Sequence, residues 1–189
     1  MSSWDYERRR ALERLYEHAS AGRVDPDILQ ELIELNARKD CIYTTSSCSG
    51  RVVHIRGRDP FDKRGSELLW LTHSPSECRA TVCARKQPST GRTLSWLSLQ
   101  PPIIHLRARS SEVADRVVAC ARSAGFARAC YRFEGGAYTV EVAAHDKVHL
   151  LLPAPCEVAV LLCGQLERYK ARLRRLFECL LGLPCARSF

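Results

Sequence analysis

Apolar residues recur at helical spacing in the first part of the chain. They predict one helix from Trp4 to about Ala19, which Gly22 ends. A second helix follows directly, with Asp25 as its N-cap and Pro26 as its first helical position. Both patterns are typical of amphipathic helices that pack one face on a core.

The middle of the chain is dominated by strand patterns. The predicted strands are Cys41–Thr45, Arg51–Ile55, Glu67–His73, Thr93–Leu99, Ile103–Arg109, Phe126–Phe133, Ala137–Val142 and Lys147–Leu152. Further helices are expected from Ser74-Pro75 toward Lys86, from Glu112 to about Ala124, and from about Glu157 to Leu180. The polar stretch from Gly57 to Ser66 is expected to be a mobile loop.

The order of these elements favours an α+β fold. Strands follow one another in places and are separated by helices in others, so the alternation of a doubly wound protein is absent. We therefore expect one domain over residues 1–189, with a mixed sheet and flanking helices. No Gly-x-Gly-x-x-Gly or P-loop pattern occurs, so a nucleotide-like cofactor would bind in a non-Rossmann way.

The net charge of the chain indicates a kind of partner. Lys and Arg total 29 against 21 acidic residues, a net charge of +8, and only five of the 29 are Lys. Guanidinium groups bind phosphate and stack on bases, so this surplus fits RNA, although a GC-biased or thermophilic genome with solvated faces would also produce it. The chain has no membrane-length apolar run and its N-terminus lacks a secretory pattern, so we expect a cytoplasmic protein.

Ten cysteines are many for a cytoplasmic protein. No pair has the Cys-x2-Cys spacing of a zinc site, since the closest pair, Cys78 and Cys83, are five residues apart. Intracellular proteins of hyperthermophiles are an exception to the rule that disulfides belong to secreted proteins. The expectation for most of the ten is nevertheless a buried, inert thiol.

The most distinctive polar segment is Thr44–Arg51, which holds five hydroxyl groups, a thiol, a glycine and an arginine. A turn over Ser46–Gly50 would point backbone N–H groups and hydroxyls into one concavity, and Arg51 would add a cation, which suits a phosphate or carboxylate. Taken by itself, the segment is better explained by a plain Ser-rich β-turn. Cys48 is a possible nucleophile, but Arg51 follows it too closely for a cysteine-phosphatase loop.

Three histidines, His54, His73 and His105, lie on predicted strands. If neighbouring strands bring them together, they are candidates for a zinc site, a general base or groups that recognise a nucleobase. Trp70 is a candidate for stacking on a base or on a sulfonium, and a core tryptophan is the alternative.

Several segments together resemble the wybutosine-synthesis protein 3 family of archaea and eukaryotes, in a short form similar to the archaeal one. The matching stretches are Val24-Asp25, Tyr43-Thr44-Thr45-Ser46-Ser47-Cys48-Ser49-Gly50-Arg51, Trp70-Leu71-Thr72-His73, Pro101-Pro102-Ile103-Ile104-His105-Leu106 and Ala124-Gly125-Phe126. The resemblance covers roughly residues 5–180. The chain departs from the family pattern at Ala21-Gly22, Gln100, Ala129-Cys130 and Ala143-Ala144.

The resemblance implies a fold of the family's own and transfer of a methyl group from S-adenosylmethionine. The acceptor would be the N-4 nitrogen of a wybutosine precursor beside the anticodon of phenylalanine tRNA. The residues carried over by motif match are Asp25, Ser46, Ser47, Cys48, Ser49, Gly50, Arg51, Trp70, His73 and His105.

We predict that Ser46–Arg51 binds a carboxylate or phosphate, as the cofactor site. His73 or His105 is predicted to handle the proton, with Asp25 orienting one of them, and no metal is expected. Predicted contacts to the base or RNA are Trp70, Arg107, Arg109 and arginines of the C-terminal helix. No membrane or DNA partner is expected, and the oligomeric state is open. The alternatives are a non-catalytic basic RNA-binding module, a zinc hydrolase and a cysteine-dependent enzyme.

Overall fold

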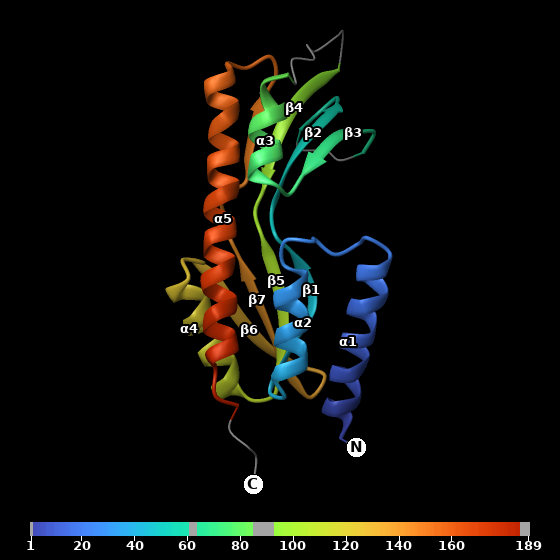
Figure 1. The fold of residues 1–189 in the computed structure, drawn as a ribbon, viewed down its shortest axis with the longest axis vertical. Coiled ribbons are helices and arrows are strands. Elements are labelled where there is room, and N and C mark those ends of the chain that lie inside the picture. Colours follow the sequence, from blue (N-terminus) through green and yellow to red (C-terminus); the bar gives the residue numbers. More distant parts are fainter. Residues whose placement is uncertain (1, 61–63, 85–92, 186–189) are drawn as a thin grey trace. The chain divides into compact units, whose positions relative to one another are not determined.

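The computed structural model describes residues 2–60, 64–84 and 93–185, and the chain divides into two compact units (Figure 1). Unit 1 consists of Met1–Ser49, Pro102–Ala144 and Ala171–Phe189. Unit 2 consists of Gly50–Pro101 and His145–Lys170. Each unit is therefore assembled from separate stretches of the sequence.

Unit 1 is built on a four-stranded antiparallel sheet, sheet A, with the strand order β1-β5-β7-β6. Its strands are β1 (Ile42–Cys48), β5 (Ile103–Ala108), β6 (Arg128–Glu134) and β7 (Ala137–Ala143). On β5, Ile104, Leu106 and Ala108 are buried and the residues between them are half-buried. This alternation gives sheet A an inner face on the core and a polar outer face.

The helices of unit 1 are α1 (Ser3–Ser20), α2 (Leu29–Arg38), α4 (Ser111–Ser123) and the last part of α5 (Cys156–Gly182). Ser110 is the N-cap of α4, where its hydroxyl accepts the N–H of Val113 at 3.4 Å. The N-terminal helix α1 differs from expectation: of its predicted apolar stripe only Ala11 is buried. Most of α1 therefore faces solvent.

Unit 2 is built on a second four-stranded antiparallel sheet, sheet B, with the order β3-β2-β4-β8. Its elements are β2 (Arg51–Gly57), β3 (Glu67–Thr72), α3 (Pro75–Thr81), η1 (Val82–Ala84), β4 (Leu94–Gln100), β8 (Val148–Leu151) and the first part of α5. Ser74 caps α3 with Pro75 in the first turn, as predicted. The expected extension to Lys86 lies outside the described residues, as does part of the expected loop over 57–66.

The α+β class is confirmed, but the expected single mixed sheet is wrong. The strands form two sheets, and every strand pair among the described residues is antiparallel. The adjacent strands β4 and β5 belong to different sheets because Pro101-Pro102 separates them, and proline has no N–H to continue a ladder. The hairpin of β6 and β7 across Glu134–Ala137 agrees with the prediction.

The predicted start of the second helix is also wrong. Helix α2 begins at Leu29, and the residues from Pro26 to Ile28 form a turn. Instead of capping this helix, the Asp25 carboxylate accepts the backbone N–H of Ser49 at 2.6 Å. A distant partner has therefore replaced the local capping interaction.

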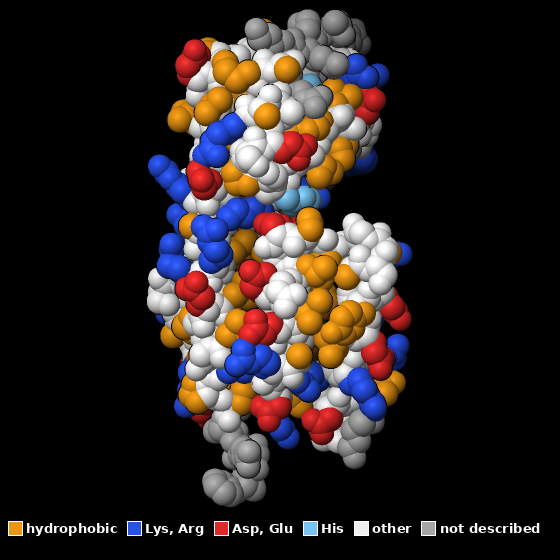
Figure 2. Space-filling view, viewed as in Figure 1, with side chains coloured by type: hydrophobic (Ala, Val, Ile, Leu, Met, Phe, Trp, Pro, Cys, Tyr) orange, Lys and Arg blue, Asp and Glu red, His pale blue; other side chains and the backbone are white. Residues whose placement is uncertain are grey.

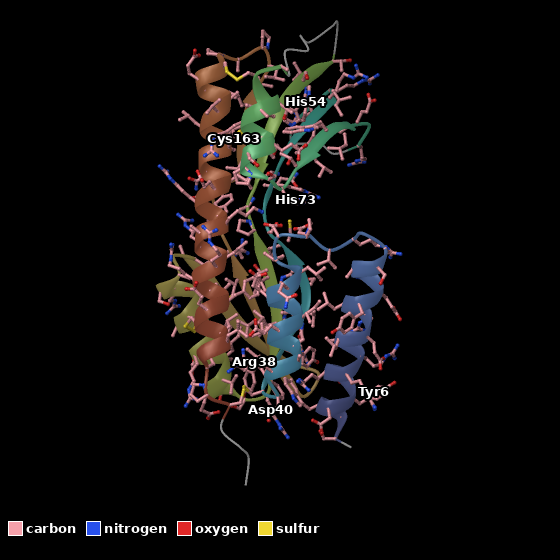
Figure 3. All side chains as sticks on the ribbon, viewed as in Figure 1. Tyr6, Arg38, Asp40, His54, His73 and Cys163 are labelled. Atoms are coloured by element: carbon pink, nitrogen blue, oxygen red, sulfur yellow. A yellow bond between two sulfur atoms is a disulfide. The ribbon has the colours of Figure 1, made fainter. Side chains whose placement is uncertain are left out.

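The expectation of inert thiols is wrong for most of the ten cysteines. Disulfides join Cys41–Cys185 and Cys120–Cys179 in unit 1, and Cys78–Cys163 and Cys83–Cys156 in unit 2. Each ties α5, or the segment that follows it, to an earlier part of the chain; Figure 3 labels Cys163 on α5. The free cysteines are Cys48 and Cys130.

Helix α5 is the longest element of the described chain, with 27 residues, and contributes residues to both units. Figure 2 shows Lys and Arg side chains over the middle part of α5 on the face drawn there, because the basic residues of this helix all lie between Arg168 and Arg175. No helix among the described residues combines the length and apolar character that crossing a membrane requires.

Candidate active site

The outer face of sheet A carries a row of polar side chains across three neighbouring strands. Ser46 on β1 pairs in register with His105 on β5, and His105 pairs with Glu141 on β7. Residues paired across antiparallel strands project their side chains to the same face. The row therefore lies on the side of the sheet opposite the buried Ile104 and Leu106.

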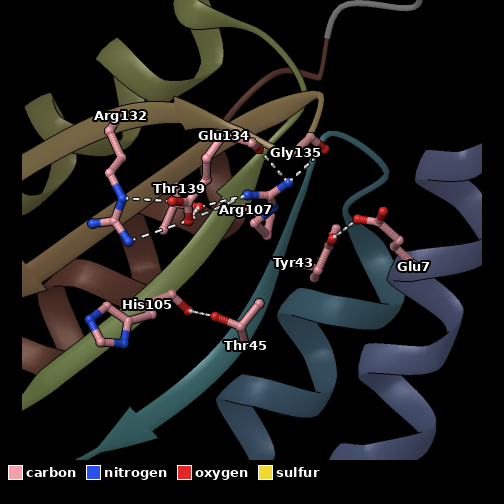
Figure 4. A network of polar contacts seen from close by, with 9 residues as sticks. All are labelled: Glu7, Tyr43, Thr45, His105, Arg107, Arg132, Glu134, Gly135 and Thr139. Carbon is pink, nitrogen blue, oxygen red and sulfur yellow. Dashed lines mark hydrogen bonds and ion pairs between the residues drawn. The ribbon is translucent and has the colours of Figure 1, made fainter.

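A β-bulge brings Ser46 into this row. Thr44 pairs with Leu106 and Ser46 with His105, so that Thr45 is the extra residue in β1. Without it, Ser46 would point to the opposite face, because side chains alternate along a strand. With the bulge, Ser46 Oγ lies 2.6 Å from His105 Nδ1. Thr45 Oγ1 also donates to the backbone oxygen of His105 at 3.5 Å (Figure 4).

Glu141 holds the other side of the His105 ring. Its Oε2 lies 3.4 Å from His105 Nε2, and its Oε1 lies 3.4 Å from Nε of Arg128. A carboxylate only accepts, so a hydrogen bond to Glu141 requires a proton on Nε2, and in that tautomer Nδ1 can accept the Ser46 hydroxyl proton. The His105 side chain is 31% exposed and Ser46 is exposed. The arrangement can take up a proton from a group that approaches Ser46.

The predicted serine-rich turn is instead mostly strand. Thr44 to Cys48 belong to β1, where Ser46, Ser47 and Cys48 pair with β5. Only Ser49 and Gly50 connect β1 to β2, with Gly50 at φ 81°. The hydroxyls are therefore presented along an edge strand and not by a turn, and Thr44 to Ser47 contribute to the lining of a hollow of ≈180 Å³.

Ser49 is fixed by two carboxylates. Its backbone N–H donates to Asp25 Oδ2 at 2.6 Å, and its hydroxyl donates to Asp27 Oδ1 at 2.8 Å. Both interactions are partly buried, so they anchor the end of β1 to the turn before α2. Asp27 was not singled out from the sequence.

Arg51, on β2 in unit 2, donates from Nε to Oε1 of Gln100 at 2.7 Å. Gln100 stands where the family pattern leads one to expect a glutamate. A neutral amide leaves the charge of the guanidinium uncompensated at this contact, which suits an anionic ligand. Arg51 is half-buried.

The other predicted residues of unit 2 lie on or beside sheet B. Trp70 on β3 is half-buried and pairs in register with His54, and His73 follows the end of β3 and is also half-buried. His54 is 1% exposed, and its Nε2 lies 2.7 Å from Ser95 Oγ (Figure 3 labels it). His105, by contrast, belongs to sheet A. The expectation that neighbouring strands bring the histidines together is therefore wrong for β3 and β5, which belong to different sheets.

Arg107 and Arg109 have different surroundings. Arg107 Nη1 donates to Thr139 Oγ1 at 2.7 Å, and its Nη2 donates to the backbone oxygens of Glu134 and Gly135 at 2.9 and 3.2 Å (Figure 4). Its side chain is only 12% exposed, so it mainly fastens the β6–β7 hairpin. Arg109 is exposed directly after β5.

Sequence reasoning missed Glu141, the acidic neighbour of His105. The alternation of polar and apolar residues over Ala137–Val142 indicated that Glu141 faces outward. Its pairing with His105 depends on which strand lies beside β7, and no local pattern contains that information.

A family model described as Methyltransferase TYW3 matches residues 6–178. Among curated relatives, a Saccharolobus solfataricus protein is 34% identical over 128 residues, which cover 67% of this chain and 59% of that protein. A Pyrococcus abyssi protein is 31% identical over 183 residues, covering 90% of this chain and 86% of that protein. The Saccharolobus protein is named tRNA(Phe) 7-((3-amino-3-carboxypropyl)-4-demethylwyosine(37)-N(4))-methyltransferase, and the Pyrococcus protein bears the same name with the suffix 2.

The fold is also found among solved structures. The PH1069 protein of Pyrococcus horikoshii superposes with a TM-score of 0.81 at 24% identity, covering 93% of this chain and 95% of that one. This likeness supports the fold, and the family match covers nearly the whole sequence. The chain belongs to the Methyltransferase TYW3 family.

Proposed function

We propose that the chain methylates the N-4 nitrogen of a wybutosine precursor, of the 7-aminocarboxypropyl-demethylwyosine type, beside the anticodon of phenylalanine tRNA. The methyl donor is S-adenosylmethionine. The observation that carries this proposal is the family match over residues 6–178, together with the names of the Saccharolobus and Pyrococcus relatives.

His105 is the proposed proton acceptor. The reacting nitrogen gives up one proton as the new bond to carbon forms, and a group within hydrogen-bond reach must take it. The exposed Ser46 hydroxyl can accept that proton while it passes its own to Nδ1 of His105, 2.6 Å away. Glu141 then stabilises the charged ring through Nε2, at 3.4 Å. His73 is the second candidate for this role, and that Asp25 orients one of the two histidines stays a prediction.

The segment Ser46–Arg51 is the proposed cofactor site. Arg51 has a neutral hydrogen-bond partner in Gln100, so its charge suits the carboxylate of the methionine part. Ser47, Cys48 and Gly50 precede Arg51 in the sequence and offer further polar groups. S-adenosylmethionine supplies a methyl group made electrophilic by its sulfonium. The chain's own task is to orient the base, exclude water and hold the proton.

RNA contacts are proposed for residues outside this segment. Trp70 is proposed to stack on the tricyclic base, and the exposed Arg109 to contact phosphate. The same role for Arg107 stays a prediction, because its donors point to the β6–β7 hairpin. A base in a single-stranded loop can leave its stack at lower cost than a paired one.

We propose that both units act together as one methyltransferase domain, located in the cytoplasm where tRNA is processed. The support is that each unit is assembled from separate stretches, so that no single cut in the chain separates them. The family match likewise runs through both units.

The direct test uses purified protein, labelled S-adenosylmethionine and tRNA from a strain lacking this methylation step. Label should enter the precursor base, identified after digestion to nucleosides. Unmodified tRNA transcript, which lacks the precursor, should stay unlabelled. If precursor-bearing tRNA stays unlabelled as well, the enzymatic proposal fails. Titration of the protein with S-adenosylmethionine in a calorimeter then distinguishes an inactive enzyme from an RNA-binding module, which would show no heat of binding.

A further inference from the structure

Helix α1 carries a ridge of four residues at a spacing of four: Tyr6, Arg10, Arg14 and His18. Residues four apart lie on one face of a helix, and each step rises about 6 Å along its axis. All four side chains belong to exposed residues. The ridge therefore presents a row of cationic and aromatic groups at regular intervals.

This ridge borders two hollows that lie within unit 1. The first, of ≈400 Å³, is lined on α1 by Tyr6, Arg10 and Arg14, and on sheet A by residues that include Thr45 and Thr139. The second, of ≈180 Å³, is lined by residues that include Arg14, His18, Arg23 and Thr45. Because the two hollows share Arg14 and Thr45, they form one groove between α1 and β1, called here the α1 groove.

The arginines of the α1 groove are not neutralised by carboxylates. Arg10, Arg14 and Arg23 have no acidic partner within the described part of the chain, and Arg10 contacts only the ring and hydroxyl of Tyr6. Exposed arginines elsewhere, such as Arg38 and Arg79, pair with glutamates. The α1 groove therefore keeps a positive charge.

The acidic residues that line the groove are engaged with other groups. Glu7 accepts the hydroxyl proton of Tyr43 at 3.0 Å, and both burial and this hydrogen bond raise the pKa of Tyr43. Glu134 accepts from Arg132 at 2.8 Å and from Thr139 at 2.7 Å. These carboxylates therefore bind other residues of unit 1 and do not pair with Arg10, Arg14 or Arg23.

The groups in the groove match a nucleic-acid strand. Guanidinium groups about 6 Å apart suit successive phosphates, and the exposed hydroxyls of Thr45 and Ser46 add donors along the wall. Tyr6 is 46% exposed, with the Arg10 guanidinium 5.9 Å from its ring centre, and forms a platform on which a base can stack. An acidic peptide would match the charge but leave this platform unused.

We propose that the α1 groove binds the phosphate backbone of a single-stranded stretch of RNA next to the base that is modified. The inference rests on the proposed function, which supplies the RNA partner. It assigns to α1 a role that the sequence pattern of an amphipathic core helix did not indicate.

The test measures binding of fluorescein-labelled, unmodified phenylalanine tRNA transcript by anisotropy at several salt concentrations. In the double variant Arg10→Gln/Arg14→Gln, affinity should fall at least about tenfold, and the slope of log affinity against log salt should fall by about 1.4 for two lost phosphate contacts. The control Arg38→Gln/Arg79→Gln removes the same charge from arginines paired with glutamates and should change affinity less than about threefold. Circular dichroism checks that both variants fold.

Equal losses in the two double variants would mean a diffuse charge effect and would overturn the inference, as would wild-type affinity in the groove variant. Polyglutamate and polyuridylate are also compared as competitors of the tRNA. If polyglutamate displaces the tRNA at the same concentration of negative charge as polyuridylate, the inference is overturned in favour of an acidic peptide. Methyl transfer by the wild type shows that the proposed function stands in any of these cases. A wild type that neither binds tRNA nor methylates it would remove both proposals.

Discussion

Sheet A and sheet B each place a histidine on a strand beside a serine, with opposite consequences. His105 Nδ1 lies 2.6 Å from Ser46 Oγ, and His54 Nε2 lies 2.7 Å from Ser95 Oγ. The His105 side chain is 31% exposed, whereas His54 is 1% exposed. The two histidine–serine hydrogen bonds are therefore similar in length, but only His105 is accessible to solvent.

The difference teaches that a histidine–serine contact alone does not mark a reactive group. His54 lies on the face of sheet B that carries the fully buried Leu97, its partner in register. Here the contact satisfies polar atoms that burial would otherwise penalise. On the outer face of sheet A the same contact leaves Ser46 open to a substrate and adds Glu141 behind the ring.

The largest expected effect concerns the solvent-accessible pair of His105 and Ser46. His105→Ala should lower kcat for methyl transfer by about 10²–10⁴-fold, the range for loss of a general base. The melting temperature should change little, because the side chain is partly exposed. Turnover of precursor-bearing tRNA under saturating S-adenosylmethionine measures the first quantity. Activity within a factor of three of the wild type would assign His105 to structure.

The disulfides extend the comparison to the stability of each unit. Cys120→Ala in unit 1 and Cys78→Ala in unit 2 should each lower the free energy of unfolding by about 2–5 kcal/mol, because each bond closes a long loop. Guanidinium titration measures this quantity. The control Cys130→Ala removes a free, exposed thiol and should change it little. If a reducing agent leaves the melting temperature of the wild type unchanged, the four disulfides do not stabilise the protein as proposed.

Substitution in the buried pair of His54 and Ser95 should affect stability more than turnover, the reverse of the result expected for His105. His54→Ala leaves Ser95 buried without its partner and should cost about 1–3 kcal/mol of folding free energy. Once folded at low temperature, the variant should retain most of its kcat. Urea unfolding and turnover of the same preparation measure both values. A loss of turnover without a loss of stability would reverse the assignment of the two histidines.

Glu141→Gln tests whether the carboxylate behind His105 matters. The amide keeps the shape of the side chain but removes its charge, so kcat should fall about tenfold, as for loss of an orienting partner. KM for tRNA should stay unchanged, because Glu141 has no proposed contact with RNA. Arg132→Gln removes a charge from the same face and serves as control. A rise in KM with an unchanged kcat would instead indicate a binding role.

The smallest expected effect concerns His149 on β8 of sheet B. Burial, and secondarily the charge of Lys147, lower its pKa below the usual 6.5. The unfolded chain then binds the proton more readily, so this contribution to stability is present above pH 6.5 and is lost as the pH falls through the folded pKa. Thermal melts between pH 7.5 and 5.5 should show a weaker pH dependence for His149→Asn. Identical pH profiles would contradict this.

The sequence by itself determined the local elements. The capped helices α3 and α4, the β6–β7 hairpin and the apolar alternation on β5 follow from interactions among residues close in the chain. It also pointed to His105 and Ser46 through the resemblance to a family, although not to their contact.

Only the tertiary structure decided the features that depend on distant partners. The bulge at Thr45, the pairing of Glu141 with His105, the exposure of α1 and the division into two sheets each depend on which strands meet. The disulfides likewise join residues 59 to 144 positions apart. Local periodicity indicates which face of an element is polar, whereas the choice of neighbour is a property of the whole chain, because it depends on how all apolar faces are buried together.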